Sequence, residues 1–427
     1  MEPKTAKLTV DGQTYEFPVF VGPEGETAID IRKLRQETGI ITYDPGFANT
    51  GSCKSAITFM DGEKGVLRYR GYPIDVLAEN CSFVETAFLL INGHLPNRKE
   101  LISTSVMLND YSLVHEDMQI FYQNFPRGSH PMGILSAMIN ALRSFYPELK
   151  DDEGINSTFL RLLSKIRTLA AMSYKISRGH KVIYPRADYT YCANFLNMMF
   201  DSPVKPYHLN PDIENALNAF WILHGDHEQN CSTAAVRVVG SGRVNLYAAI
   251  SAGISALWGP LHGGANQAVI EMFNWMKEEQ ISVTDVVKRA KDKSDPFRLM
   301  GFGHRVYKTY DPRAKIMKQI CHRLLDSLNI MDPLLETAME LEKVALTDSY
   351  FIDHNLYPNV DFYSGIVLRS MGIPLNMFTV MFAIGRLPGW IAQWKESMDD
   401  PEWRISRPRQ VYMGEQERAF LPIDERP

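Results

Sequence analysis

The sequence has few cysteines, and no motif pairs them. Its 427 residues include 5 cysteines, an odd number, and they are widely spaced with no C-x-x-C pair. A disulfide framework or a thiolate zinc site is therefore not expected. The chain also lacks an excess of basic charge, since 50 acidic side chains outnumber 45 basic ones and give a formal net charge of −5. That balance excludes a strongly basic nucleic-acid binder, so no nucleic-acid partner is expected.

No segment has the features of an export signal or of a long membrane span. The first ten residues read MEPKTAKLTV, with no apolar run after a basic start and no Arg- and Ser-rich presequence. We therefore expect a cytoplasmic location. The most apolar stretches, Leu246 to Leu261 and Ile373 to Ile384, are shorter than the roughly 20 residues that cross a bilayer. We interpret both as buried helices of a soluble protein and expect no membrane partner.

The composition is that of an ordinary globular protein, with 45% hydrophobic residues. Hairpin signals lie near the start of the chain. Apolar side chains alternate around the turn dipeptide Asp11-Gly12, which predicts a first hairpin. A second is predicted where short apolar runs over residues 56–60 and 66–70 flank a Gly-rich turn. These signals indicate a small β region at the N-terminus.

Helix signals dominate the remainder of the chain. Ser82 and Glu85 form a capping-box pattern, and Asn210 precedes a proline at a first helical position. The three-and-four spacing of apolar residues predicts further helices over residues 160–176, 266–275, 314–328 and 334–346. The sequence thus predicts a mainly α protein.

Glycine-flanked histidines are the first candidates for chemistry. His262 stands in GPLHGG and His304 in GFGHR, and glycine lets backbone and ligand approach an ionisable side chain closely. The alternative is that both are loop histidines with structural hydrogen bonds. His224 and His227, beside Asp226, form a second cluster that could be half of a hydrolytic metal site. The chain has no H-E-x-x-H motif to support that metal site.

Several charged residues at helix starts or in apolar runs could likewise have a structural role or a role in binding. Asp311, before Pro312, is expected to cap a helix. Arg313 in its first turn opposes the helix dipole unless it holds an anion. Asp361 precedes an apolar helix, where a carboxylate is favoured for structural reasons alone. Arg386 lies deep in an apolar run, so it must either pair with a core carboxylate or bind an anion.

Taken in order, these segments closely resemble the active-site segments of citrate synthases. The matching stretches are GPLHGGANQ, GFGHRVYKTYDPRA, PNVDFYSG, ILHGDHEQN, FAIGRLPGW and ISRPRQ. The resemblance extends from about Asp44 to Tyr412 and includes the N-terminal β region of the bacterial branch. It implies a two-domain helical citrate-synthase-like fold. It also implies a transferase of the tricarboxylic acid cycle that condenses acetyl-CoA with oxaloacetate and needs no cofactor and no metal.

The resemblance also implies roles for individual residues. Asp361 matches the general base, His262 the group that stabilises the enolate, and His304 the group that polarises oxaloacetate. The matches for substrate binding are His227, Arg313, Arg386 and Arg407, the last reaching the neighbouring subunit's site in a homodimer or hexamer. The matches for CoA binding are Arg298, Gly301, Gly303 and Lys308.

The domain boundaries combine the resemblance with a composition shift along the chain. We expect an N-terminal β-rich region over 1–65, a large helical domain over 66–266 plus 374–427, and a small helical domain over 267–373. The small domain is expected to close over the site after oxaloacetate binds. The nearest alternative is 2-methylcitrate synthase, which uses propionyl-CoA with the same groups. A metal-dependent hydrolase on a helical scaffold and a non-enzymatic helical scaffold are more distant alternatives.

One departure from the family concerns regulation by NADH. The NADH-inhibited hexameric branch usually has a basic pair and a cysteine where this chain has Asp110, Tyr111 and Val204, although Arg161 and Lys165 remain. We therefore predict weak or absent inhibition by NADH.

Overall fold

The computed structural model describes residues 4–126, 128–147 and 152–426, and it divides into two compact units. The first unit combines Met1–Ser55 with Ser406–Pro427, and the second is Ala56–Ile405. The second predicted hairpin therefore belongs to the larger unit. The expected division of that unit at residues 267 and 373 stays a prediction.

The smaller unit is built on the first predicted hairpin, which the structure confirms. Strands β1 (Thr5–Val10) and β2 (Gln13–Val21) pair antiparallel, and β3 (Thr27–Ile29) pairs with the end of β2. The turn residues Asp11 and Gly12 both have positive φ, 50° and 80°, the conformation that a two-residue hairpin turn requires. The unit also contains α1 (Leu34–Thr38) and the short 3₁₀ helix η2 (Ile423–Glu425).

The larger unit is almost entirely helical, which confirms the mainly α prediction. It begins with the second hairpin, β4 (Thr58–Asp61) and β5 (Val66–Tyr69), to which β6 (Tyr72–Pro73) adds an edge. The helices that follow are α2 (Ile74–Asn80), α3 (Phe83–Asn92), α4 (Arg98–Asp110), α5 (Met118–Asn124), α6 (Pro131–Phe145), α7 (Asp152–Ser177), α8 (Tyr191–Phe200), α9 (Pro211–Leu223), α10 (Cys231–Gly240) and α11 (Leu246–Leu257). The second half contains α12 (Ala265–Glu278), α13 (Val283–Lys291), α14 (Pro312–Leu328), α15 (Pro333–Thr347), α16 (Ser349–Asp353), α17 (Val360–Ser370), the 3₁₀ helix η1 (Leu375–Met377) and α18 (Phe378–Asp399).

The caps read from the sequence form as predicted. Ser82 and Glu85 make a reciprocal capping box at the start of α3. Asn210 accepts N–H bonds from the first turn of α9, and Asp311 accepts the N–H of Arg313 at the start of α14. Each cap satisfies N–H groups that a helix start leaves without a partner.

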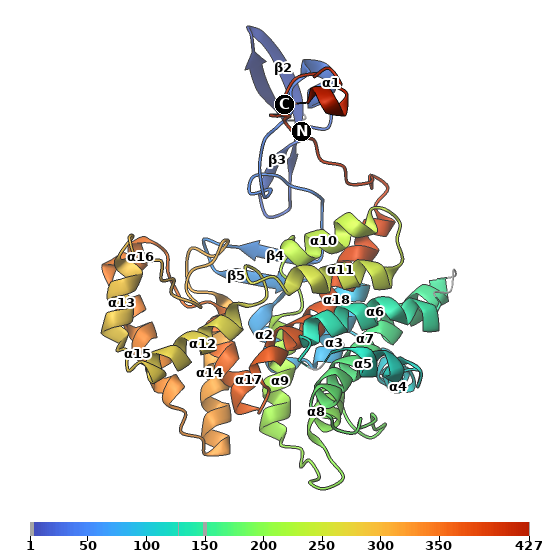
Figure 1. The fold of residues 1–427 in the computed structure, drawn as a ribbon, viewed down its shortest axis with the longest axis vertical. Coiled ribbons are helices and arrows are strands. Elements are labelled where there is room, and N and C mark those ends of the chain that lie inside the picture. Colours follow the sequence, from blue (N-terminus) through green and yellow to red (C-terminus); the bar gives the residue numbers. More distant parts are fainter. Residues whose placement is uncertain (1–3, 127, 148–151, 427) are drawn as a thin grey trace. The chain divides into compact units, whose positions relative to one another are not determined.

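Helix α18 forms the centre of the larger unit and contacts α3, α7, α9, α10 and α11 (Figure 1). The segment Leu375–Asp399 is long and apolar enough to cross a membrane, but 89% of its most apolar window is buried inside the protein. This agrees with a core helix. Gly389 allows the close packing, since a Cβ there would lie 2.2 Å from the carbonyl oxygen of Gly225.

Candidate active site

Six of the expected site residues come from loops, helix starts and the core helix of the larger unit. They are His227 between α9 and α10, His262 between α11 and α12, His304 before α14, Arg313 in the first turn of α14, Asp361 in the first turn of α17, and Arg386 within α18. Ring contacts and charge interactions connect them, as described below.

His304 is held in one neutral tautomer by the backbone. Its Nδ1 accepts hydrogen bonds from the N–H groups of Val306 and Tyr307, at 3.0 and 3.2 Å. A ring nitrogen that accepts N–H bonds carries no hydrogen, so neutral His304 has its proton on Nε2. Burial, with help from the positive charge of Arg313, lowers the pKa of His304 to about 4. His304 is therefore a neutral Nε2–H donor at neutral pH.

His227 faces this donor. The ring centroids of His227 and His304 are 5.2 Å apart, and His227 Nε2 lies 3.3 Å from the Tyr307 hydroxyl. His227 is buried, and burial together with the charge of Arg313 puts its pKa well below the usual value. The structure thus brings two predicted residues together with Tyr307, which the sequence reasoning did not select.

His262 is held in the opposite neutral tautomer. Its Nε2 accepts the backbone N–H of Ser232 at 3.2 Å and lies 2.8 Å from the Ser232 hydroxyl. Trp390 in α18 donates its indole N–H to the same hydroxyl at 3.2 Å. In neutral His262 the proton consequently sits on Nδ1. Burial, with help from the positive charge of Arg386, lowers the pKa of His262 to about 4. His262 is also a neutral donor.

The pKa of Asp361 is shifted upward, in contrast to the lowered pKa values of the histidines. Burial raises the pKa of its carboxyl to about 6, while Arg313 opposes the rise and Asp311 adds to it. Its backbone N–H donates to the Asn359 side chain at 3.0 Å, so Asn359 caps α17. The pKa places Asp361 near the working range of a general base at neutral pH.

Arg313 and Asp311 form a buried ion pair. Two parallel hydrogen bonds join them, Nε to Oδ1 at 3.1 Å and Nη2 to Oδ2 at 2.9 Å. Burial disfavours the charge of Arg313, but Asp311 outweighs it and the pKa of Arg313 is raised. Asp311 therefore has the structural role expected of it and also holds Arg313 in place.

Arg386 has no such carboxylate partner among the described residues. Its Nε donates to the carbonyl oxygen of His224 at 2.6 Å, and its guanidinium lies over the Phe382 ring at 4.9 Å. Its Nη1 is buried with no hydrogen-bond partner in the described parts of the chain. Burial lowers the pKa of Arg386 to about 10, with Asp226 opposing the shift. A buried cation with an unfilled donor is suited to an anion.

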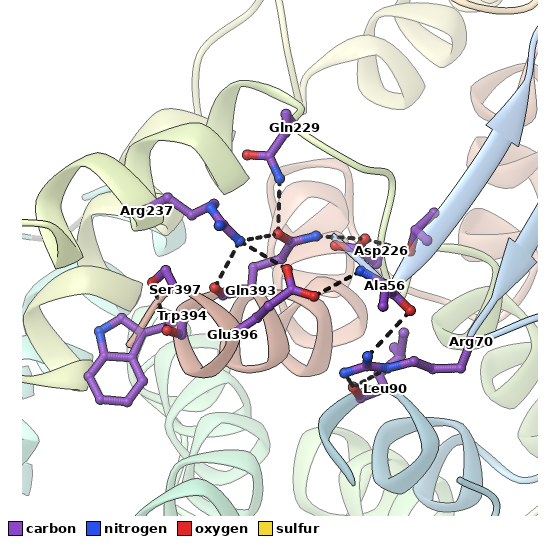
Figure 2. Close-up of polar contacts among 11 residues, drawn as sticks. Ala56, Arg70, Leu90, Asp226, Gln229, Arg237, Gln393, Trp394, Glu396 and Ser397 are labelled. Atoms are coloured by element: carbon purple, nitrogen blue, oxygen red, sulfur yellow. Dashed lines mark hydrogen bonds and ion pairs between the residues drawn. The ribbon is translucent and has the colours of Figure 1, made fainter. Parts of the chain in front are cut away.

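A polar network behind the site supports Asp226 (Figure 2). Asp226 accepts hydrogen bonds from Thr58 at 2.6 Å and from Gln393 at 3.3 Å. The Gln393 side-chain oxygen in turn accepts bonds from Gln229 and Arg237, both at 2.9 Å. Burial raises the pKa of Asp226, and its charge is one that acts on Arg386.

The expected CoA-binding glycines have a clear structural task. A Cβ at Gly301, whose φ is +81°, would lie 2.8 Å from a side-chain carbon of Val269. The carbonyl oxygens of Gly301 and Gly303 accept hydrogen bonds from Asn359, at 2.9 and 3.0 Å. These bonds hold the segment of His304 beside the start of α17. Arg298 and Lys308 have exposed side chains on either side of this segment.

Two further predictions can be placed individually. Arg407 is exposed and belongs to the smaller unit. His224 is buried, stacks on Phe220 and contacts its carbonyl oxygen through Nδ1 at 2.7 Å, whereas His227 faces Tyr307. Within residues 4–126, 128–147 and 152–426, no group of three or more His, Cys, Asp or Glu side chains is placed to hold a metal.

The comparisons with known proteins agree with one another. A family model described as "Citrate synthase, C-terminal domain" matches residues 46–409. Citrate synthase 1 of Mycobacterium tuberculosis (strain CDC 1551 / Oshkosh) is 48% identical over 425 residues, which covers 99% of each chain. The chain belongs to the citrate synthase family.

Solved citrate synthases have the same fold. The Pyrobaculum aerophilum enzyme is 32% identical with a TM-score of 0.80, covering 99% of this chain and 100% of its own. The Thermoplasma acidophilum enzyme, solved in a ternary complex with carboxymethyl coenzyme A and oxaloacetate, has 32% identity and a TM-score of 0.82, covering 90% of this chain and 100% of its own. As a citrate synthase, the chain is an enzyme of the acyltransferase class that works in the tricarboxylic acid cycle.

Sequence reasoning did not find the supports of this citrate synthase site. Ser232 and Trp390 hold His262, Tyr307 contacts His227, and Phe382 lies under Arg386. The contact between Phe382 and Arg386 lies within one turn of α18, whereas the other contacts join positions far apart in the chain. Signals were present for three of these residues, since Tyr307 lies within the recognised segment GFGHRVYKTYDPRA and Phe382 and Trp390 lie within FAIGRLPGW.

Proposed function

We propose that this enzyme condenses acetyl-CoA with oxaloacetate and water to give citrate and CoA. One observation carries the proposal: His262 and His304 each accept a backbone N–H at one ring nitrogen, which leaves a neutral N–H donor at the other. The charge of Arg386 acts on His262, that of Arg313 acts on His304, and both act on the raised-pKa carboxyl of Asp361. The Thermoplasma acidophilum enzyme, complexed with carboxymethyl coenzyme A and oxaloacetate, supports the same pair of substrates.

The first step is removal of a proton from the methyl group of acetyl-CoA. Asp361 takes the proton, and the Nδ1–H of His262 donates to the thioester oxygen as the enolate forms. The methyl group is a very weak acid, so the base succeeds only if the oxygen is stabilised in the same step. A neutral imidazole suits this task because it needs no change of charge before the reaction.

The second step is attack of the enolate on the ketone of oxaloacetate. The Nε2–H of His304 donates to the keto oxygen, and His227 contributes a further contact there. Arg313 and Arg386 bind the substrate carboxylates, because planar guanidinium groups match carboxylates in a bidentate way. The citryl thioester that results is then hydrolysed by water, which releases citrate and CoA.

Water must be excluded while the enolate exists, and we assign this to domain closure. The small domain, residues 267–373, carries His304, Arg313 and Asp361, so closing it on the large domain assembles the site. We propose that CoA is bound at the edge of the moving domain by Arg298, Gly301, Gly303 and Lys308.

A complete site is proposed to require a second subunit. Arg407 reaches the partner's oxaloacetate in a homodimer or a hexamer made of dimers, so a monomer is inactive. The enzyme is proposed to be cytoplasmic and to use no cofactor and no metal beyond its substrates.

Weak or absent inhibition by NADH remains part of the proposal. Lys165 donates to the carbonyl oxygens of Tyr111 and Leu113 and lies 4.1 Å from the Tyr146 ring centroid. Arg161 lies over the Tyr111 and Tyr146 rings. Internal contacts already engage both cations, which supports the prediction.

Release of free thiol on mixing the protein with oxaloacetate and each acyl-CoA tests this function. We expect fast release with acetyl-CoA, unchanged by excess EDTA, and a lower kcat/KM with propionyl-CoA. One methylene in an apolar pocket changes specificity by only about 1–3 kcal/mol, so both substrates must be measured. A preference for propionyl-CoA would assign 2-methylcitrate synthase, and loss of activity with EDTA would favour a metal-dependent enzyme.

A further inference from the structure

A cavity of about 960 Å³ lies away from the residues described above. It is lined by the turn between α2 and α3, by α4, by the loop before α8 and the start of α8, by α9, and by the middle of α14. Sites for small molecules commonly occupy roughly 300–1,000 Å³. None of the proposed catalytic or substrate-binding residues lines this cavity.

A buried arginine on α7, Arg167, lines the cavity and is only 1% exposed. Its guanidinium lies over the Tyr191 ring at 4.5 Å, and its Nη atoms make long contacts of 3.4 Å to the carbonyl oxygens of Tyr191 and Leu108. Its Nε has no hydrogen-bond partner among the described residues. None of the carboxylates that the structure describes forms an ion pair with Arg167. A charge buried this way is costly unless something compensates it.

The carboxylates that line the same cavity have contacts of their own. Asp188 pairs with Arg186, Glu214 accepts from the Thr190 hydroxyl, Asp212 accepts from the Ser327 hydroxyl, and Glu79 is exposed. None of them forms a bond to Arg167 in the structure. The positive charge at the buried end of the cavity is therefore left without an anionic partner.

The start of α8 adds donors at the same end. Tyr191 and Cys192 are the first two residues of this ten-residue helix and line the cavity. Their backbone N–H groups have no acceptor among the described residues, because the Thr190 hydroxyl caps the N–H of Ala193 instead. Helix starts with free N–H groups favour negative charge.

We propose that this cavity binds a small molecule through an oxyanion, a phosphate or carboxylate group, held between the Arg167 guanidinium and the start of α8. The site is separate from that of the proposed reaction. It differs from the surroundings of Arg161 and Lys165, which contact Tyr111 and Tyr146.

Helix α14 connects the cavity to the oxaloacetate site. Ile316, Ile320 and Leu324 line the cavity, and Arg313 stands in the first turn of the same helix. An occupant would restrain the helix that carries Arg313. We therefore expect occupancy to change the KM for oxaloacetate more than kcat.

Calorimetric titration of the full-length protein, with oxaloacetate held at saturation, tests the site. The probes are inorganic phosphate and succinate, measured separately so that phosphate and carboxylate recognition are distinguished. The variants are Arg167→Met, which removes the charge, and Arg167→Lys, which keeps it without the planar fork. Arg161→Met is the matched control, since it removes an arginine of the same helix that does not line the cavity.

We expect at least one probe to bind wild type and Arg161→Met alike, and its affinity to fall about tenfold or more in Arg167→Met and less in Arg167→Lys. Without probe, Arg167→Met should melt no lower than wild type, because it removes an uncompensated buried charge. Equal affinity in wild type and Arg167→Met, or no millimolar binding of either probe to wild type, overturns the proposal. A lower melting temperature for Arg167→Met with unchanged probe binding by that same variant also overturns it and makes Arg167 a structural residue.

Discussion

The pH dependence of the reaction follows from the different environments of Asp361 and the two donor histidines. Burial raises the pKa of Asp361 to about 6 and lowers the pKa values of His262 and His304 to about 4. The base must be ionised to accept a proton, and the histidines must be neutral. Of these three groups only Asp361 changes its charge between pH 5 and 8, so kcat/KM should show a single acidic limb centred near pH 6.

The size of the effect can be worked from that pKa. A carboxyl with a pKa of about 6 is about nine-tenths ionised at pH 7 and about one-tenth ionised at pH 5, so kcat/KM should fall about tenfold between these values. Stopped-flow or steady-state thiol release across pH 5–8, at limiting acetyl-CoA, measures it. An essential protonated histidine would instead make the rate fall as pH rises.

Asp311→Asn moves this limb in a direction that the structure fixes. The charge of Asp311 raises the pKa of Asp361, while the charge of Arg313 lowers it. Without the negative charge of Asp311, the charge of Arg313 lowers the pKa of Asp361. The acidic limb should therefore move to lower pH. Asparagine can still cap α14, and a thermal melt checks the fold. An unchanged limb, or one displaced to higher pH, would refute this account of the site's electrostatics.

Three substitutions test the supports of the site. Ser232→Ala removes the hydroxyl 2.8 Å from His262 Nε2 but keeps the backbone N–H bond; kcat should fall about tenfold with little change in the KM for oxaloacetate, by steady-state kinetics. Gln393→Leu removes the bond that Gln393 donates to Asp226 and those that it accepts from Gln229 and Arg237, and it should cost about 2–4 kcal/mol in urea unfolding. Gly389→Ala places a Cβ 2.2 Å from a backbone oxygen and should cost about 3 kcal/mol or more in the same assay. Variants that behave like wild type would contradict these contacts.

Local features of the fold could be predicted well because neighbouring residues determine them. The Asp11-Gly12 turn and the Ser82 capping box form where the sequence places them, since each depends on residues a few positions apart. The motifs around His262 and His304 indicated the citrate synthase family for the same reason.

The roles within the site depended on tertiary contacts. Trp390 reaches Ser232 across 158 positions of the chain, and the backbone N–H of Ser232 decides which nitrogen of His262 carries the proton. The surroundings of Arg386 also depended on packing: it contacts the carbonyl oxygen of His224 and the Phe382 ring of its own helix, and no carboxylate among the described residues pairs with it. Arg167 lies within the helix predicted over residues 160–176, and its burial follows from packing against other segments of the chain.

The measurement that tests the central claim most directly is thiol release from acetyl-CoA and oxaloacetate by Asp361→Asn, beside calorimetric titration with oxaloacetate. The exposed Asp353→Asn on α16 is the matched control. We predict that Asp361→Asn lowers kcat about 10³-fold, the size expected for loss of a general base, while oxaloacetate binds as in wild type and Asp353→Asn stays fully active. Near-normal thiol release by Asp361→Asn would contradict the account.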